Sequence, residues 1–118
     1  MTDEAGGRTM IGDSSEDCAR ELTQAGADAI GANCGSIDPA QMAAIVAALT
    51  AATNLPVLAQ PNAGRPKLAG ERTVFEMEPA AFAEGVAECL LAGARLVGGC
   101  CGTTARHIRA LADVLSKR

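Results

Sequence analysis

The sequence predicts an α/β fold built on a parallel sheet. Three short apolar runs, at 27–33, 56–60 and 94–99, are bounded by glycine or proline and have the length of buried strands. Four stretches with helical patterning lie before, between and after these runs. Regular alternation of helices and strands is typical of parallel sheets joined by right-handed crossovers.

The first two helices have clear start signals. Ser14, with Asp17 three residues later, predicts a helix over 15–25 that stops at Gly26. Asp38 and Pro39 begin the second helix, as N-cap and first helical residue. Its predicted buried face consists of Met42, Ile45, Val46 and Leu49.

The last two helices also have start signals and an apolar face. Pro79 begins a helix that ends before Gly93 and turns Phe82, Val86 and Leu90 to one side. Thr103 or Thr104 caps the final helix, for which the spacing predicts an inward face of Ile108, Leu111, Ala112 and Leu115. Residues 1–13 and 61–73 are predicted to be loops.

Size and charge narrow the functional classes. The chain has 118 residues, enough for about one domain, and its net charge of −4 argues against binding nucleic acid. No apolar run reaches the roughly 18–20 residues needed to cross a membrane. The beginning of the chain lacks the apolar stretch of a secretory signal, so we expect a cytoplasmic protein.

Three strands are too few for a closed (β/α)8 TIM barrel, which takes about 200–250 residues. A three-stranded sheet has two open edges. The chain is therefore a small open domain, one piece of a barrel, or a homo-oligomer or partner complex that completes the sheet.

Three of the five cysteines follow predicted strand ends. Cys34 comes after the first strand, and Cys100 and Cys101 come after the third. The carboxyl ends of parallel strands share one edge of a sheet, so these thiols should converge. Three thiolates at about 2.3 Å would leave one tetrahedral position of Zn²⁺ open, as in catalytic sites, and soft sulfur ligands favour zinc. A thiol entering that position loses its proton, which suits attack on an electrophilic methyl group.

Other residues have simpler interpretations. Cys18 and Cys89 fall inside helices and are expected to be inert. His107 could be a fourth ligand or a base, but a position on the helix surface is the stronger expectation. The turn at 98–104 could hold phosphate but lacks the lysine of a P-loop, and Cys100 and Cys101 lack the Cys-x-x-Cys spacing of a redox pair. Asn62 could simply stabilise its turn.

Three motifs, Asn-Cys-Gly at 33–35, Pro-Asn-Ala-Gly at 61–64 and Gly-Gly-Cys-Cys-Gly-Thr-Thr at 98–104, together resemble the homocysteine S-methyltransferase family. This family includes methionine synthases and betaine–homocysteine methyltransferases. The resemblance implies that residues 1–118 are the C-terminal part of a homocysteine-binding (β/α)8 barrel, with its sixth to eighth strands. It also implies zinc on Cys34, Cys100 and Cys101, with Asn62 and Asn33 beside the homocysteine substrate.

The resemblance has two departures. Ala105 replaces a proline that is usual in the family, and the first five strands, which would hold much of the substrate, are absent. Methyl transfer to homocysteine, giving methionine, is therefore expected to need more than this chain. The alternative is a non-catalytic zinc- or thiol-binding module, or a remnant half-barrel that assembles with a partner. The methyl donor is set outside this sequence.

Overall fold

The structure, a computed structural model, describes Met1 and residues 7–118. Its elements in chain order are α1 (Ser15–Gln24), β1 (Ile30–Asn33), α2 (Pro39–Ala52), β2 (Val57–Gln60), β3 (Lys67–Ala69), β4 (Arg72–Val74), α3 (Pro79–Leu91), β5 (Leu96–Val97) and α4 (Ala105–Ser116). Residues 2–6 of the predicted N-terminal loop lie outside the described residues, and 7–13 form a turn in which Gly12 N–H donates to Thr9 O at 3.0 Å.

A three-stranded sheet has the order β1-β2-β5, and both pairings are parallel. The predicted α/β class with parallel strands is thus confirmed. The strands are shorter than predicted: β1 begins at Ile30 rather than at 27, and β5 is confined to Leu96–Val97. The pairs Gly31↔Leu58 and Leu58↔Leu96 fix the register. An alanine Cβ at Gly31 would lie 2.3 Å from Leu58 O, so this close pairing requires glycine.

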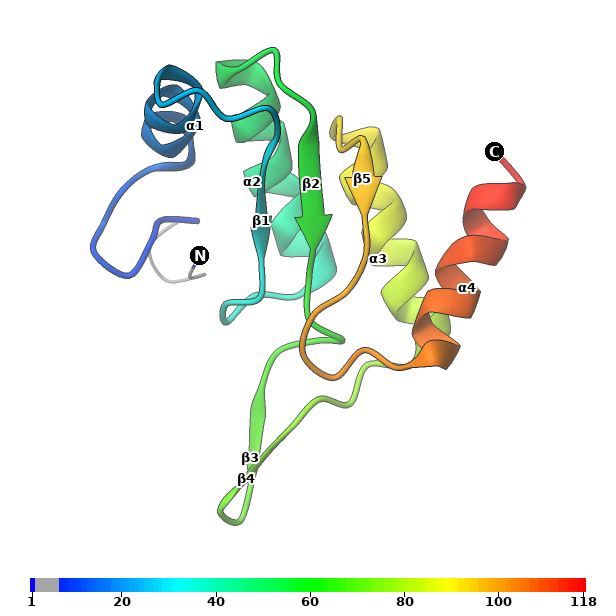
Figure 1. Ribbon diagram of the computed structural model, residues 1–118. Coiled ribbons are helices and arrows are strands. Elements are labelled where there is room, and N and C mark those ends of the chain that lie inside the picture. Colours follow the sequence, from blue (N-terminus) through cyan, green and yellow to red (C-terminus); the bar gives the residue numbers. More distant parts are fainter. Residues whose placement is uncertain (2–6) are drawn as a thin grey trace.

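Helices cover one face of the sheet. In Figure 1, α2 and α3 lie behind the strands, and the face toward the viewer has no covering element among the described residues. The predicted buried face of α2 is confirmed, and it packs with Ile30 and Val57 in the main core cluster. Asp38 caps α2 as predicted, because its side chain accepts from Gln41 N–H at 2.8 Å.

The other side of the sheet is open. Because side chains alternate along a strand, Gly31, Asn33, Leu58, Gln60 and Leu96 share this second face. Leu96 is 51% exposed. The sheet therefore has one packed face and one face that no described element covers.

The inward face predicted for α4 is correct at Leu111, which is buried, but wrong at its other three residues. Ile108 is 44% exposed, Leu115 is 38% exposed and Ala112 is exposed. The buried residues of α4 are His107 and Leu111, and Ala110 and Val114 pack partly buried against the same cluster. Both stripes have helical spacing, but the true one is rotated by one residue, or about 100°. The expectation that His107 lies on the helix surface is also wrong, because His107 is buried.

The segment 61–73, predicted to be a loop, contains most of a hairpin that the sequence pattern did not predict. Strands β3 and β4 pair antiparallel, with Ala69 opposite Arg72 across a two-residue turn. The hairpin projects from the end of the molecule at which β1 and β2 finish (Figure 1). Leu68 on it is 80% exposed. Within the described part of the chain, no helix is long and apolar enough to cross a membrane.

Candidate metal centre

The three cysteines predicted to converge lie together at the carboxyl end of the sheet. Cys34 Sγ is 3.6 Å from Cys101 Sγ, across 67 residues of sequence, and Cys100 Sγ is 4.0 Å from Cys101 Sγ. All three sulfur atoms lie within 4.8 Å of one another. Parallel strands bring them together, because each thiol follows a strand that ends at the same edge.

Backbone hydrogen bonds extend the sheet pattern past the strand ends. Cys34 N–H donates to Gln60 O at 3.2 Å, which joins the first loop to the end of β2. On the other side of β2, Cys100 N–H donates to Pro61 O at 2.9 Å. The positions of the thiols are thus set by the backbone of the central strand.

Asn62 ties the two cysteine loops to each other. Its side chain is buried, with 1% exposed, and its Nδ2 donates to Gly35 O at 2.9 Å. Its Oδ1 accepts from Cys101 N–H at 3.1 Å. Both ends of the amide therefore hold the backbone beside a cysteine, a role that extends beyond stabilising the turn that contains Asn62.

Asn33 lies on the open side of the centre. It is the last residue of β1 and is exposed. Its Nδ2 contacts Cys100 Sγ at 3.8 Å, which is the length of a weak N–H···S hydrogen bond. This contact places an amide donor next to the thiol cluster.

The backbone at Cys34 has an unusual conformation. Cys34 has φ of 56°, the single positive φ at a non-glycine residue in the described chain, and Gly35 follows with φ of 83°. A side chain in this left-handed region costs of order 1–2 kcal/mol. The turn directs the thiol of Cys34 toward Cys101, as their short Sγ–Sγ distance shows.

The cluster also changes the acidity of its thiols. Burial raises the pKa of Cys34, but hydrogen bonds from Cys101, from Gly35 N–H, from Cys100 and from Asn62 together bring it below its ordinary value. The hydrogen bonds that the Cys101 thiol makes to Cys34 and Cys100 raise the pKa of Cys101 to about 11. Without a metal, Cys34 is thus the more acidic of these two thiols and Cys101 the less acidic.

The spacing of the sulfur atoms fits a metal ion. Ligands about 2.3 Å from a tetrahedral zinc ion are separated by about 3.8 Å. Two of the three Sγ–Sγ separations, 3.6 and 4.0 Å, lie on either side of that value, and the third is within 4.8 Å. Within the described residues, the group of His, Cys, Asp and Glu that could hold a metal consists of these three cysteines, so one tetrahedral position would stay open.

The remaining cysteines lie apart from this centre. Cys18 is half-buried on α1, and Cys89 is buried on α3. Cys89 Sγ donates to Pro39 O at 3.4 Å, and burial raises the pKa of its thiol to about 11. Both positions agree with the expectation of inert thiols.

His107 is not a ligand in this arrangement. Its Nε2 lies 2.7 Å from Met77 O, and its Nδ1 lies 3.2 Å from Thr104 N and 2.8 Å from Thr104 Oγ1. Sequence reasoning missed this buried role. The signal was the spacing of Thr104 and His107, three residues apart at a helix start, which is that of a capping box.

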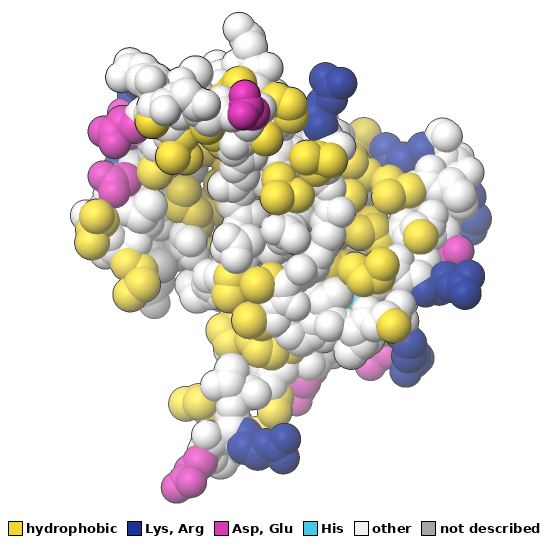
Figure 2. Space-filling view, viewed as in Figure 1, with side chains coloured by type: hydrophobic (Ala, Val, Ile, Leu, Met, Phe, Trp, Pro, Cys, Tyr) yellow, Lys and Arg dark blue, Asp and Glu magenta, His cyan; other side chains and the backbone are white. Residues whose placement is uncertain are grey.

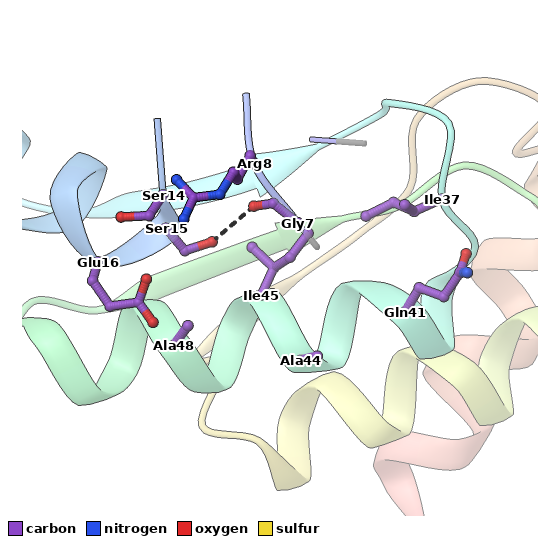
Figure 3. A pocket seen from close by; sticks show the side chains of 10 residues that line it. All are labelled: Gly7, Arg8, Ser14, Ser15, Glu16, Ile37, Gln41, Ala44, Ile45 and Ala48. Carbon is purple, nitrogen blue, oxygen red and sulfur yellow. Dashed lines mark hydrogen bonds between the residues drawn. The ribbon is translucent and has the colours of Figure 1, made fainter. Parts of the chain in front are cut away.

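A pocket of about 480 Å³ lies elsewhere, between the start of α1 and one side of α2 (Figure 3). None of the three clustered cysteines lines it. Ser15 Oγ donates to Gly7 O at 3.2 Å, as the dashed line in Figure 3 shows, and Arg8 Nη1 donates to Gly12 O at 2.8 Å. The Ser15 hydroxyl and the Arg8 guanidinium are thus engaged with nearby backbone carbonyl groups. We therefore take the cysteine cluster, and not this pocket, as the candidate functional site.

Known proteins resemble this chain in sequence and in structure. Methionine synthase of Mycobacterium leprae is 34% identical over 118 residues, which are 99% of this chain and 10% of that protein. Methionine synthase of Mycobacterium tuberculosis is 35% identical over 117 residues, 98% of this chain and 10% of that protein. The crystal structure of the homocysteine methyltransferase MmuM from Escherichia coli, in its oxidized form, matches with a TM-score of 0.60 and 30% identity, over 86% of this chain and 33% of that one.

The chain therefore spans about a tenth of the length of these curated relatives. The sequence model of the homocysteine S-methyltransferase family matches residues 1–115, nearly the whole chain. The chain belongs to the homocysteine S-methyltransferase family.

Proposed function

We propose that this chain supplies the zinc-binding part of an enzyme that transfers a methyl group to the sulfur of homocysteine, giving methionine. The observation that carries the proposal is the convergence of three thiols to within 4.8 Å in a chain of this family. Cys34, Cys100 and Cys101 would hold the ion. When bound, zinc would lower the pKa of a substrate thiol that takes the open fourth position.

The protein groups would prepare the site for that thiol. Asn62 holds the loops of Cys34 and Cys101 at a fixed separation through Gly35 O and Cys101 N–H. Asn33 is exposed beside Cys100. We propose that both asparagines lie next to homocysteine, with Asn33 offering an N–H donor toward the sulfur atoms and Asn62 fixing the ligand geometry. A centre of reduced thiols also fits a reducing compartment, and we propose the cytoplasm.

The open side of the sheet supports a second part of the proposal. Leu96 lies on the uncovered face, and Ile108 and Leu115 on α4 are also exposed. Figure 2 shows hydrophobic side chains on this face over the region of β5 and α4. We propose that a partner chain or further copies complete a (β/α)8 barrel, in which β1, β2 and β5 are the last three strands, and supply the rest of the substrate pocket.

The zinc content of protein purified under reducing conditions tests the metal site. We expect about one zinc per chain, lost in Cys100→Ala and retained in Cys18→Ala, which removes a thiol outside the cluster. If zinc is present, a Co²⁺-substituted sample titrated with homocysteine should show a change in its sulfur-to-metal charge-transfer bands. A folded chain without zinc would refute the proposal, and zinc without any response to homocysteine would reduce it to a metal-binding module.

Analytical ultracentrifugation tests whether another chain binds to the uncovered face of the sheet. Leu96→Asp places a charge on the uncovered sheet face without touching the cysteines. We expect self-association of the parent chain, or its binding to the missing part of the barrel, to be abolished in this variant. Glu84→Asp, a conservative change at an exposed position on α3, serves as the control.

A further inference from the structure

His107 is buried and carries hydrogen bonds at both ring nitrogens. A backbone N–H can only donate and a carbonyl can only accept, so the contacts determine the tautomer. Nδ1 accepts from Thr104 N–H at 3.2 Å, and Nε2–H donates to Met77 O at 2.7 Å. The ring edge also packs against Phe82, with 5.4 Å between centroids and 88° between planes. His107 thus joins the start of α4 to Met77, 30 residues earlier in the chain.

Met77 in turn is connected to the cysteine centre. Its N–H donates to Ala63 O at 3.2 Å, and Ala63 N–H donates to Cys101 O at 2.9 Å. Ala63 is fully buried and follows Asn62, which holds Cys101 N–H. Hydrogen bonds that are joined through the backbone of Met77 and Ala63 therefore connect the imidazole of His107 to Cys101 O, and the neighbouring Asn62 side chain holds Cys101 N–H.

The segment 75–78, between the hairpin and α3, makes a second contact with the cysteine turn. Phe75 packs so closely on Gly102 that a Cβ at Gly102 would lie 2.2 Å from Phe75 Cβ. Gly102 directly follows Cys101 and has φ of 76°. The position of segment 75–78 and the path of the backbone after Cys101 are therefore coupled.

We infer that His107 is a positioning residue for the cysteine centre: it fixes segment 75–78, and through Met77 and Ala63 it holds the backbone of Cys101 in place. The inference rests on the proposed function in taking the cluster as a zinc site. Loss of the imidazole releases Met77 O and the start of α4 together. Cys101 then gains freedom relative to Cys34, and the thiols lose their common spacing.

Two substitutions in the 118-residue chain test the inference. His107→Phe keeps an aromatic ring to pack against Phe82 but removes the hydrogen bonds at both ring nitrogens. His107→Gln keeps an acceptor and a donor on a more flexible side chain. Leu111→Ala is the matched control, because Leu111 is buried in the same cluster as Phe82 but has no part in the series of hydrogen bonds.

Zinc affinity is measured by competition with a chromophoric chelator. We expect zinc binding to weaken by about 10-fold or more in His107→Phe, which is the range for removing groups that orient metal ligands. His107→Gln should fall between His107→Phe and the parent. Leu111→Ala should lower the melting temperature but leave the zinc affinity within about twofold of the parent.

A second readout needs no metal. Dibromobimane bridges neighbouring thiols, and peptide mapping gives the yield of the Cys34–Cys101 cross-link in the metal-free chain. We expect the yield to fall in both His107 variants and to stay unchanged in Leu111→Ala. Parent chain without zinc but with this pattern of cross-linking would refute the proposed function and support the positioning role.

Equal affinity and equal cross-linking in the parent, in His107→Phe and in Leu111→Ala would overturn the positioning role. If His107→Phe does not fold, His107→Gln decides the result on the same two measurements.

Discussion

Asn62 Oδ1 accepts a hydrogen bond from the backbone N–H of Cys101, 39 residues away, at 3.1 Å. The other end of the same amide holds Gly35 O, next to Cys34. One buried side chain thereby sets the separation of two loops that carry thiols. This arrangement is of the kind by which outer groups orient metal ligands.

Replacing Asn62 should therefore damage both the fold and the metal site. Asn62→Ala leaves Gly35 O and Cys101 N–H without their partner, and we expect a loss of about 2 kcal/mol in the free energy of unfolding. Zinc affinity should fall by about 10–100-fold. Urea unfolding and chelator competition measure the two effects. Asn54→Ala, at an exposed asparagine, is the control and should change neither.

Zinc binding should release protons and strengthen as pH rises. The pKa of Cys101 is raised to about 11, so its thiol is protonated at neutral pH and must lose that proton to become a ligand. The lowered pKa of Cys34 means that this residue contributes less to proton release near neutrality. We expect release of at least about one proton per zinc near pH 7.5.

Calorimetry in buffers of different ionisation enthalpy measures the number of protons released. Cys89→Ala should leave the number unchanged, because Cys89 is buried on α3 away from the cluster although its pKa is also about 11. Zinc affinity that falls between pH 6 and pH 8 would contradict the assignment of thiolate ligands.

Gly102→Ala should be far more harmful than a similar change at the hairpin tip. An alanine at Gly102 has both an unfavourable positive φ and a Cβ 2.2 Å from Phe75 Cβ. We expect a loss of about 2–4 kcal/mol in the free energy of unfolding, and weaker zinc binding. Gly70 has φ of 65° and nothing within 4 Å of an added Cβ. Gly70→Ala should therefore cost only about 1–2 kcal/mol and leave zinc binding intact. If the two variants lose similar free energies of unfolding, Phe75 must move to make room for the added methyl group, and the prediction is wrong.

The thiol cluster could be predicted from the sequence because the parallel arrangement of the strands determines where the residues after each strand lie. Cys34 and Cys101 both follow apolar runs of strand length, and such runs end at one edge of a parallel sheet. The links between the loops could not be predicted in the same way. That Asn62 reaches Gly35 and Cys101 depends on side-chain positions that periodicity does not describe.

The last helix shows how an apolar pattern can mislead. Ile108, Leu111 and Leu115 have helical spacing, but the face that packs is centred one residue earlier and includes His107. Histidine was not expected in a core because it is polar, yet hydrogen bonds to Thr104 and Met77 satisfy both nitrogens. The exposed stripe that remains is the surface we assign to a partner.

The hairpin was missed for a different reason. Its strands have three residues each and are mostly exposed, so no buried face produces an alternating pattern. The two-residue turn at Gly70 and Glu71 was the usable signal, because short hairpin loops favour glycine.

At position 34 the stability of the fold and the binding of a metal favour different residues, because the backbone there is left-handed. Cys34→Gly would relieve the unfavourable φ of 56°, and the relief of about 1–2 kcal/mol exceeds the added flexibility of the unfolded chain, about 0.5–1 kcal/mol. We expect the metal-free Cys34→Gly chain to melt no lower than the metal-free parent, while binding no zinc. Selection for folding alone would favour glycine here. The cysteine at position 34 therefore lowers the stability of the metal-free chain, and zinc binding by its sulfur would offset that loss.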